Sequence, residues 1–241
     1  LPINLILYPG YNTDAKLMIG QNLKSTMRYN LTFGQNNIND EDVYGVGHHL
    51  LGGKDNLVSG SYYGMTSGKD NVAPFEFGYG LQIGNSGSTR DYIHGAISTA
   101  AGAFAAKGDA QLTSHVVYRG QTTNNSATVI YNAAASANKW TLAANDSVLV
   151  KATVIGRKVG DAGQSAAYEV ICAFKNQGGT STAGTTGVTK RVLNEDTGTT
   201  DYDATLAVND VDDTFELQVT GDTGHNVNWM ANVEVLHLNV A

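Results

Sequence analysis

The hydrophobic pattern of the chain changes at about residue 110. Before it, short alternating stretches such as Tyr29-Leu31-Phe33 lie between glycines and predict strands of three to five residues. After it, the alternation runs longer, with apolar side chains at every second position from Val148 to Val154 and from Val227 to Val235. A period of two indicates half-buried strands in both parts, so we expect an all-β protein.

A short phrase repeats in the first part. IGQN at Ile19–Asn22 returns as FGQN at Phe33–Asn36, fourteen residues later, and GKDN at Gly53–Asn56 returns at Gly68–Asn71 after fifteen. A similar residue pair with glycine follows at steps of thirteen, at Val46-Gly47 and Ser59-Gly60. Glycine at a nearly constant step with short strands between is typical of a β-solenoid or β-roll. Because so short a turn encloses little apolar volume, we expect neighbouring chains to complete the core.

Residues 96–112 carry seven alanines, and helix propensity alone would favour a helix there. Gly102 and Gly108 interrupt this segment, and no capping box precedes it. We therefore predict the last roll turns and a linker, with a short helix as the alternative.

The second part has about nine strand candidates separated by turn residues. They are His115–Gln121, Ala127–Asn132, Lys139–Leu142, Ser147–Lys158, Ser165–Lys175, Gly187–Asn194, Ala204–Val208, Thr214–Thr220 and Val227–Val240. Regular strands without helices describe an antiparallel β-sandwich. We expect two domains: a trimeric β-roll with its linker at residues 1–110, and a jelly-roll-like β-sandwich at residues 111–241.

Charge and composition narrow the possible partners. The 15 basic and 22 acidic residues give a net charge of −7, which argues against nucleic acid. No apolar run reaches the roughly 20 residues of a membrane-spanning helix, so we expect no membrane insertion. The single cysteine, Cys172, excludes an internal disulfide framework. The sequence begins at Leu1 rather than methionine, and we expect a fragment or a processed product.

Enzyme motifs begin in the sequence but fail at a required position. The start of a dinucleotide-binding loop at Gly45 has Leu50 where the third glycine is needed. Lys54 is followed by Asp55 instead of the Ser or Thr of a phosphate-binding loop. Paired carboxylates such as Asp201 and Asp203 lie in glycine-flanked turns. Such turns would not hold a catalytic acid and a catalytic base at a fixed separation. We therefore expect no enzyme activity and no cofactor.

The candidate metal ligands do not match a known spacing. None of the six histidines has a second histidine four residues away, as a helical zinc site requires. The densest acidic cluster, Asp210, Asp212, Asp213 and Glu216, lacks the central glycine of a calcium-binding EF-hand loop. We interpret this cluster as a solvated turn and predict no metal site.

A junction between the two parts resembles a known family. Residues 107–131, KGDAQLTSHVVYRGQTTNNSATVIY, are similar to a segment common in bacteriophage tail-fibre and tailspike C-termini, where a last roll turn ending in GDAQ leads into a strand resembling VxRGQTT. The glycine-punctuated roll also resembles the heads of trimeric bacterial adhesins. The resemblance implies a homotrimeric, extracellular fibre on the virion, joined to other tail proteins through an N-terminal part, whose end contacts the host. It carries no catalytic residue into this region.

Three functions are compatible with these features. The leading hypothesis is the distal region of a phage tail fibre that binds a host surface glycan, either lipopolysaccharide or capsule. The alternatives are a tailspike polysaccharide depolymerase, and a structural fibre spacer or bacterial adhesin fragment. Because loops on a rigid scaffold commonly bind ligands, we expect receptor contacts in loops at the far end of the sandwich. The candidate residues there are Asn124, Asn125, Asn145, Asp146, Thr180, Thr182, Asp210 and Asp212.

Overall fold

The computed structural model describes residues 4–7, 16–25, 30–40, 48–59, 63–73, 80–88, 93–132, 139–160 and 164–240. The regular structure in these ranges is all β-strand, as predicted. No helix within them is long and apolar enough to cross a membrane. The chain divides into two compact units, Leu1–Thr113 and Ser114–Ala241.

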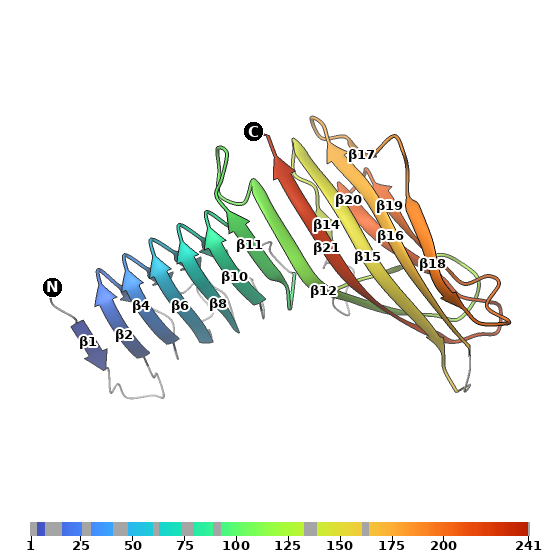
Figure 1. Ribbon diagram of the computed structural model, residues 1–241, viewed down its shortest axis with the longest axis horizontal. Coiled ribbons are helices and arrows are strands. Elements are labelled where there is room, and N and C mark those ends of the chain that lie inside the picture. Colours follow the sequence, from blue (N-terminus) through green and yellow to red (C-terminus); the bar gives the residue numbers. More distant parts are fainter. Residues whose placement is uncertain are drawn as a thin grey trace. The chain divides into compact units, whose positions relative to one another are not determined.

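The first unit is a β-solenoid whose main sheet consists mostly of parallel strands (Figure 1). The strands of this sheet, in spatial order, are β1 (Asn4–Leu7), β2 (Lys16–Gln21), β4 (Asn30–Gln35), β6 (His48–Lys54), β8 (Tyr63–Lys69), β10 (Gly80–Asn85) and β11 (Ile97–Ala101). A second parallel sheet consists of β3 (Lys24–Ser25), β5 (Ile38–Asp40), β7 (Leu57–Ser59) and β9 (Val72–Ala73). The four rungs that begin with β2, β4, β6 and β8 therefore contribute one longer and one shorter strand each. Most of the longer strands exceed the predicted length of three to five residues, because the alternation continues through the repeated glycine.

The rungs have unequal lengths. The paired residues Gly20 and Gly34 are 14 apart, Asn30 and His49 are 19 apart, Gly53 and Gly68 are 15 apart, and Gly68 and Gly84 are 16 apart. The steps of fourteen and fifteen are confirmed. The predicted continuation at steps of thirteen is wrong for the rung after β4, which takes up nineteen residues. Gly47 and Gly60, on which that prediction relied, lie outside the described residues.

The repeated glycine is required by close contact between rungs. Gly68 has a φ of +122°, and a Cβ atom there would overlap the carbonyl oxygen of Gly84 on the next rung. Gly34 has a φ of +111° and the same relation to the carbonyl of Gly53. Side chains rarely adopt this conformation, so the glycine is fixed by both backbone geometry and space.

On three rungs, a buried asparagine lies three residues after this glycine, and together these asparagines form a ladder. Asn56, which is 1% exposed, donates from Nδ2 to the carbonyl of Gly52 at 2.9 Å and to that of Gly68 at 3.0 Å. Its Oδ1 accepts the backbone N–H of Asn71 on the next rung at 3.0 Å. Asn37 and Asn71 make the equivalent bonds on their own rungs. The ladder thus satisfies backbone groups that leave the strand pairing at the turn.

The solenoid has a partly polar interior and an apolar outer face. The inward positions of successive long strands are all buried: Met18, Thr32, Leu51, Thr66, Gln82 and Ser98. The neighbouring outward positions are Leu17, Leu31, Leu50, Met65, Leu81 and Ile97, all of them exposed or half-buried. This arrangement leaves a column of large apolar side chains on the outside of the sheet.

The segment after β11 is a turn and not a helix, as predicted. The carboxylate of Asp109 accepts the backbone N–H groups of Phe104 at 3.0 Å, Ala105 at 2.6 Å and Ala106 at 2.8 Å. These bonds close a tight turn over the alanines, because three consecutive donors point at one buried carboxylate. The chain then enters β12 (Ala110–Thr122), which extends from the first unit into the second.

The second unit contains two antiparallel sheets. The long sheet comprises β12, β21 (Val227–Asn239), β15 (Asp146–Lys158) and β16 (Ser165–Asn176), with β17 (Ser181–Ala183) and β18 (Thr189–Glu195) both paired to β16. The small sheet comprises β13 (Thr128–Ile130), β20 (Thr214–Thr220) and β14 (Trp140–Thr141), with β19 (Asp203–Asn209) paired to β20. Strand β17 falls in a segment that we predicted to be entirely a turn.

The inward faces of the two sheets meet through aromatic side chains. Phe174 on β16 stacks on Phe215 of β20 with ring centroids 5.8 Å apart, and Trp140 stacks on the same Phe215 at 6.2 Å. The hydroxyl of buried Tyr168 donates to the carbonyl of Tyr202 at 2.8 Å, and burial raises its pKa. The alternation predicted from Val148 to Val154 is therefore the inward face of β15.

Candidate functional site

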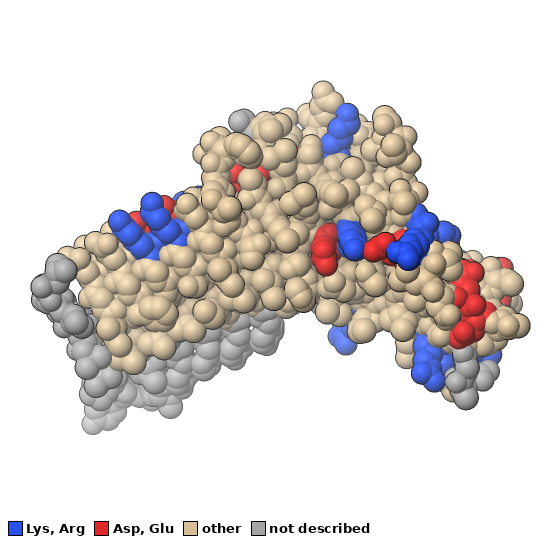
Figure 2. Space-filling model, in the orientation of Figure 1, with Lys and Arg blue, Asp and Glu red and all other residues tan. Residues whose placement is uncertain are grey.

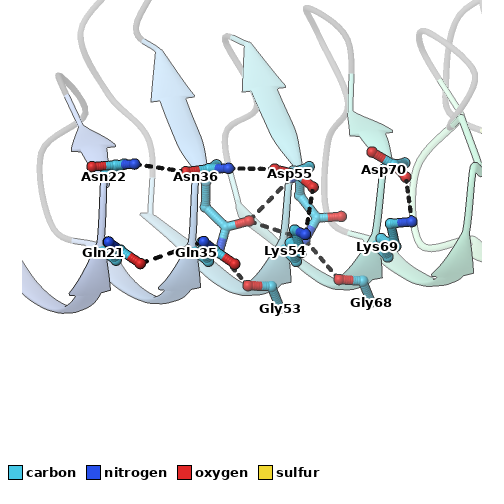
Figure 3. Close-up of polar contacts among 12 residues, drawn as sticks. Gln21, Asn22, Gln35, Asn36, Gly53, Lys54, Asp55, Gly68, Lys69 and Asp70 are labelled. Atoms are coloured by element: carbon cyan, nitrogen blue, oxygen red, sulfur yellow. Dashed lines mark hydrogen bonds and ion pairs between the residues drawn. The ribbon is translucent and has the colours of Figure 1, made fainter. Parts of the chain in front are cut away.

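An exposed polar row follows the turns of the solenoid (Figure 3). After the repeated glycine, four consecutive rungs place Gln or Lys and then Asn or Asp: Gln21-Asn22, Gln35-Asn36, Lys54-Asp55 and Lys69-Asp70. The second residue of each pair has a φ between 52° and 57°. Asn and Asp tolerate this left-handed conformation better than other residues with side chains, which explains their repetition.

Hydrogen bonds and ion pairs join neighbouring members of this row. Asn22 Nδ2 donates to Asn36 Oδ1 at 3.0 Å, and Asn36 Nδ2 donates to Asp55 Oδ1 at 2.8 Å. Asp55 and Asp70 pair with the preceding lysines at 3.7 Å and 3.4 Å. The row offers donors and acceptors at the strand spacing of about 4.8 Å, with its charges balanced within each rung.

Several of the predicted receptor-binding residues lie on connected loops of the second unit. Asn145 donates its backbone N–H to the carbonyl of Asn176 at 3.0 Å, which joins the loop before β15 to the loop after β16. Ser181 donates its N–H to Asp210 Oδ1 at 2.5 Å, which joins the second loop to the one before β20. Thr180 and Thr182 flank Ser181 and are exposed. The structure therefore brings Asn145, Thr180 and Asp210 together on connected loops, with Thr182 on the adjoining short strand β17.

Asp212 belongs to the same group and is also exposed, but it is not free. Its Oδ2 accepts from Lys139 Nζ at 2.7 Å. Among the described residues, no three His, Cys, Asp or Glu side chains gather as metal ligands, in this loop or elsewhere.

Asp146 is placed differently from the prediction. It is 1% exposed, and its Oδ1 lies 2.7 Å from both His237 Nε2 and Asn239 Nδ2. Its Oδ2 accepts the backbone N–H of Ala143 at 2.8 Å. A carboxylate so enclosed holds β15, β21 and their loop together and has no surface for a receptor. We therefore withdraw Asp146 as a receptor-contacting residue.

Asn124 and Asn125 are exposed, but they lie away from the other loops. Strand β13 pairs antiparallel with β20, with Thr128 opposite Val219, so the loop before β13 lies beside the C-terminal end of β20. The loop 209–213 leads directly into the N-terminal end of the same strand at Thr214. Seven residues at about 3.3 Å each separate the two ends. The prediction that both loops share one end is wrong, because the connection after β12 leads to the small sheet and not to a neighbouring long strand.

We did not predict from the sequence that the solenoid carries a polar row on its surface. Its signal was the repeat itself, since the GQN and GKDN phrases carry the row residues directly after the glycine. We had assigned that repeat only to the fold.

Comparison with known proteins finds similarity only among solved structures. No protein-family model matches the chain, and no curated protein matches it by sequence. A tailspike protein from Acinetobacter baumannii bacteriophage Fri1, a capsular polysaccharide depolymerase, is 10% identical, with 88% of this chain and 49% of that chain covered and a TM-score of 0.29. The tailspike of A. baumannii phage AM24 is 11% identical, with 96% and 52% covered and a TM-score of 0.32. That of Acinetobacter phage vB_ApiP_P1 is 12% identical, with 92% and 49% covered and a TM-score of 0.25.

The chain thus spans about half the length of the solved tailspike chains that it matches. Similarities of this size assign no substrate and no residue role to the chain. They do contradict our prediction that it is not an enzyme, because one of the similar proteins is a polysaccharide depolymerase. We withdraw that prediction.

Proposed function

We propose that the chain is the distal part of a homotrimeric phage tail fibre or tailspike that engages a polysaccharide of the host surface, in lipopolysaccharide or capsule. The outward apolar column of the solenoid is the observation that carries the proposal. The junction at residues 107–131, which resembles tail-fibre and tailspike C-termini, supports the same assignment. In this proposal the protein is on the virion, with other tail proteins joined to it through an N-terminal part.

The apolar column supports trimerisation because, in a single chain, it exposes large hydrophobic side chains to water. In this column Leu31 is 36% exposed and Met65 is 37% exposed. The next outward positions of the same sheet include Phe33, which is 38% exposed, and Ile83, which is 41% exposed. Contiguous apolar faces of this kind are typical of protein interfaces. Two further copies around an axis would cover the column on every rung.

The second unit has an outer face of the same character. On the long sheet, Leu149 is 45% exposed and Leu236 is 55% exposed, and with Leu238 they line an open groove of about 360 Å³. A row of alternating charge crosses the sheet between this groove and a second apolar patch around Ile155 and Met230 (Figure 2). The row runs from Glu234 through Lys151 and Glu169 to Arg191. We infer that this face also contacts other copies, with the charged row setting their register.

We further propose that residues 111–241 form a jelly-roll-like β-sandwich that serves as the receptor-binding domain. Its exposed loops and the short strand β17 carry the candidate contacts Asn124, Asn125, Asn145, Thr180, Thr182, Asp210 and Asp212. Amides, hydroxyls and carboxylates match the donors and acceptors of sugar hydroxyls. Weak binding at each site would be strengthened by three copies in one fibre.

Light scattering tests the trimer. The mass should be about three times 25.4 kDa. Met65→Arg should reduce it, because an arginine would enter the apolar column, whereas Gln21→Arg on the exposed polar row should leave it unchanged. A wild-type monomer at micromolar concentration would exclude the trimer.

Incubation with host polysaccharide tests the ligand and the activity together. Binding should be detected as adsorption to cells, and release of reducing ends identifies a depolymerase, which is the alternative. Replacing Asn124 and Asn125 with alanine should weaken adsorption without changing the mass or melting temperature. Unchanged adsorption would exclude this loop as the receptor site.

A further inference from the structure

The outer face of the small sheet carries a polar cluster that the proposed function does not yet use. Along β20, Phe215, Leu217 and Val219 point into the core and are buried. Glu216 and Gln218 alternate with them, so their side chains lie on the outer face. Unlike the outer face of the long sheet, this surface is polar.

Five side chains of this face are joined by hydrogen bonds and ion pairs. Lys139 Nζ lies 2.7 Å from Asp212 Oδ2 and 3.6 Å from Glu216 Oε1. Asn209 Nδ2 donates to the same two oxygens at 3.2 Å each. Gln218 Nε2 donates to Glu216 Oε2 at 3.2 Å. Two carboxylates therefore share one ammonium group, and the hydrogen bond to Asp212 is the main cause that raises the pKa of Lys139.

A buried hydroxyl lies on the same strand as this cluster. Thr214 is 2% exposed, and its Oγ1 has no hydrogen-bond partner among the described residues. It lies two positions before Glu216 on β20, on the same face, and pairs with Asn209 on one side and Thr141 on the other. A buried hydroxyl left unpaired is costly, and a group bound among these side chains could pair with it.

We propose that the outer face of the small sheet is a binding subsite for a neutral, hydroxyl-rich sugar of the host polysaccharide. The carboxylates of Asp212 and Glu216 would accept from sugar hydroxyls, and the amides of Asn209 and Gln218 would donate to them. Two carboxylates against one ammonium leave a net negative charge at the site, which disfavours uronic acids and other acidic sugars. This inference rests on the proposed function, because it takes the polysaccharide as its ligand.

The experiment compares two acid-to-amide substitutions. Glu216→Gln keeps the shape of the side chain but removes an acceptor and its charge, and Asp201→Asn makes the same change in an exposed turn outside the cluster. The probe is the purified surface polysaccharide of a strain to which the wild-type protein adsorbs. Glu216→Gln should bind it at least about tenfold more weakly, the loss of about 1.4 kcal/mol, and Asp201→Asn should bind it as wild type does.

Three outcomes distinguish failure of the subsite, of the proposed function and of the sugar class. If Glu216→Gln and Gln218→Ala both retain wild-type affinity and trimer mass, the subsite is refuted while the proposed function stands. If the wild-type protein binds no surface polysaccharide from any strain, the proposed function and the subsite both fail. Carboxyl reduction of the polysaccharide, which converts uronic acids to neutral sugars, should preserve or strengthen binding. Loss of binding on reduction would refute the neutral-sugar class.

Discussion

Replacing Asn56 with alanine tests whether the buried ladder stabilises the solenoid. The substitution removes the acceptor of the Asn71 backbone N–H and the side-chain donor to the carbonyls of Gly52 and Gly68. Asn56 is 1% exposed, so water does not replace these bonds unless the rungs separate. Leaving a buried group unpaired costs about 1–3 kcal/mol. The Asn71 N–H and at least one of the two carbonyls would be left unpaired, so the expected loss is about 2 kcal/mol or more.

Calorimetry measures this loss for the whole protein, and hydrogen exchange detects it at a single backbone amide. A change of 1 kcal/mol moves the melting temperature of a chain of this size by about 2–4 °C, so the expected decrease is at least about 4 °C. Exchange at the Asn71 amide should accelerate because its acceptor is gone. Gln21→Ala is the matched control, since Gln21 is an exposed amide on the polar row with a 3.4 Å contact to Gln35. If Asn56→Ala and Gln21→Ala melt together and the Asn71 amide stays protected, the ladder does not have the role we assign to it.

Three other perturbations follow from the fold. Gly68→Ala should prevent correct stacking of the rungs, because its Cβ overlaps the Gly84 carbonyl, whereas Gly178→Ala, with open space around it, should cost about 1 kcal/mol; similar yields and melting temperatures would contradict this. Asp146→Ala should lower the free energy of unfolding by about 2–6 kcal/mol in urea titrations, because it leaves His237 and Asn239 without their buried acceptor, at about 1–3 kcal/mol each; a loss under 1 kcal/mol would refute the role. Hydrogen bonds from Ser165 and Asn194 lower the pKa of Asp196, so its stabilising effect should be complete above about pH 4 and lost as the pH falls through its lower folded-state pKa. The difference in urea midpoint between wild type and Ser165→Ala should therefore shrink from pH 7 to pH 2, and a constant difference would exclude this cause.

The parts of the fold that follow from local alternation could be predicted from the sequence. The strand Thr214–Thr220 has the predicted bounds because its alternating residues divide cleanly between core and surface. The repeat at Gly53 and Gly68 identified the solenoid for a similar reason, since the glycine is needed on each rung. The nineteen-residue rung after β4 could not be predicted, because its added length lies between strands and leaves their pairing intact.

The candidate sites were harder to predict, because they depend on pairing between distant strands. Asp146 and His237 are 91 residues apart, and only the pairing of β15 with β21 makes the aspartate a buried structural group. Lys139 and Glu216 meet because β14 and β20 are neighbours, which sequence spacing does not reveal. Asn124 and Asn125 are exposed, but which end of the sheet they occupy depends on which strand follows β12.

The first strand of the solenoid has a consequence for self-association. Strand β1 runs antiparallel to β2, whereas every later rung is added in parallel. An exposed parallel edge would be a template on which a further chain could continue the same stacking, as in amyloid growth. The reversal of β1 interrupts the parallel stacking at this point of the sheet. The asparagine ladder is likewise finite, since Leu23 and Gly87 occupy its positions on the rungs before and after it. Within the described residues, the asparagine stacking is therefore limited to three consecutive rungs.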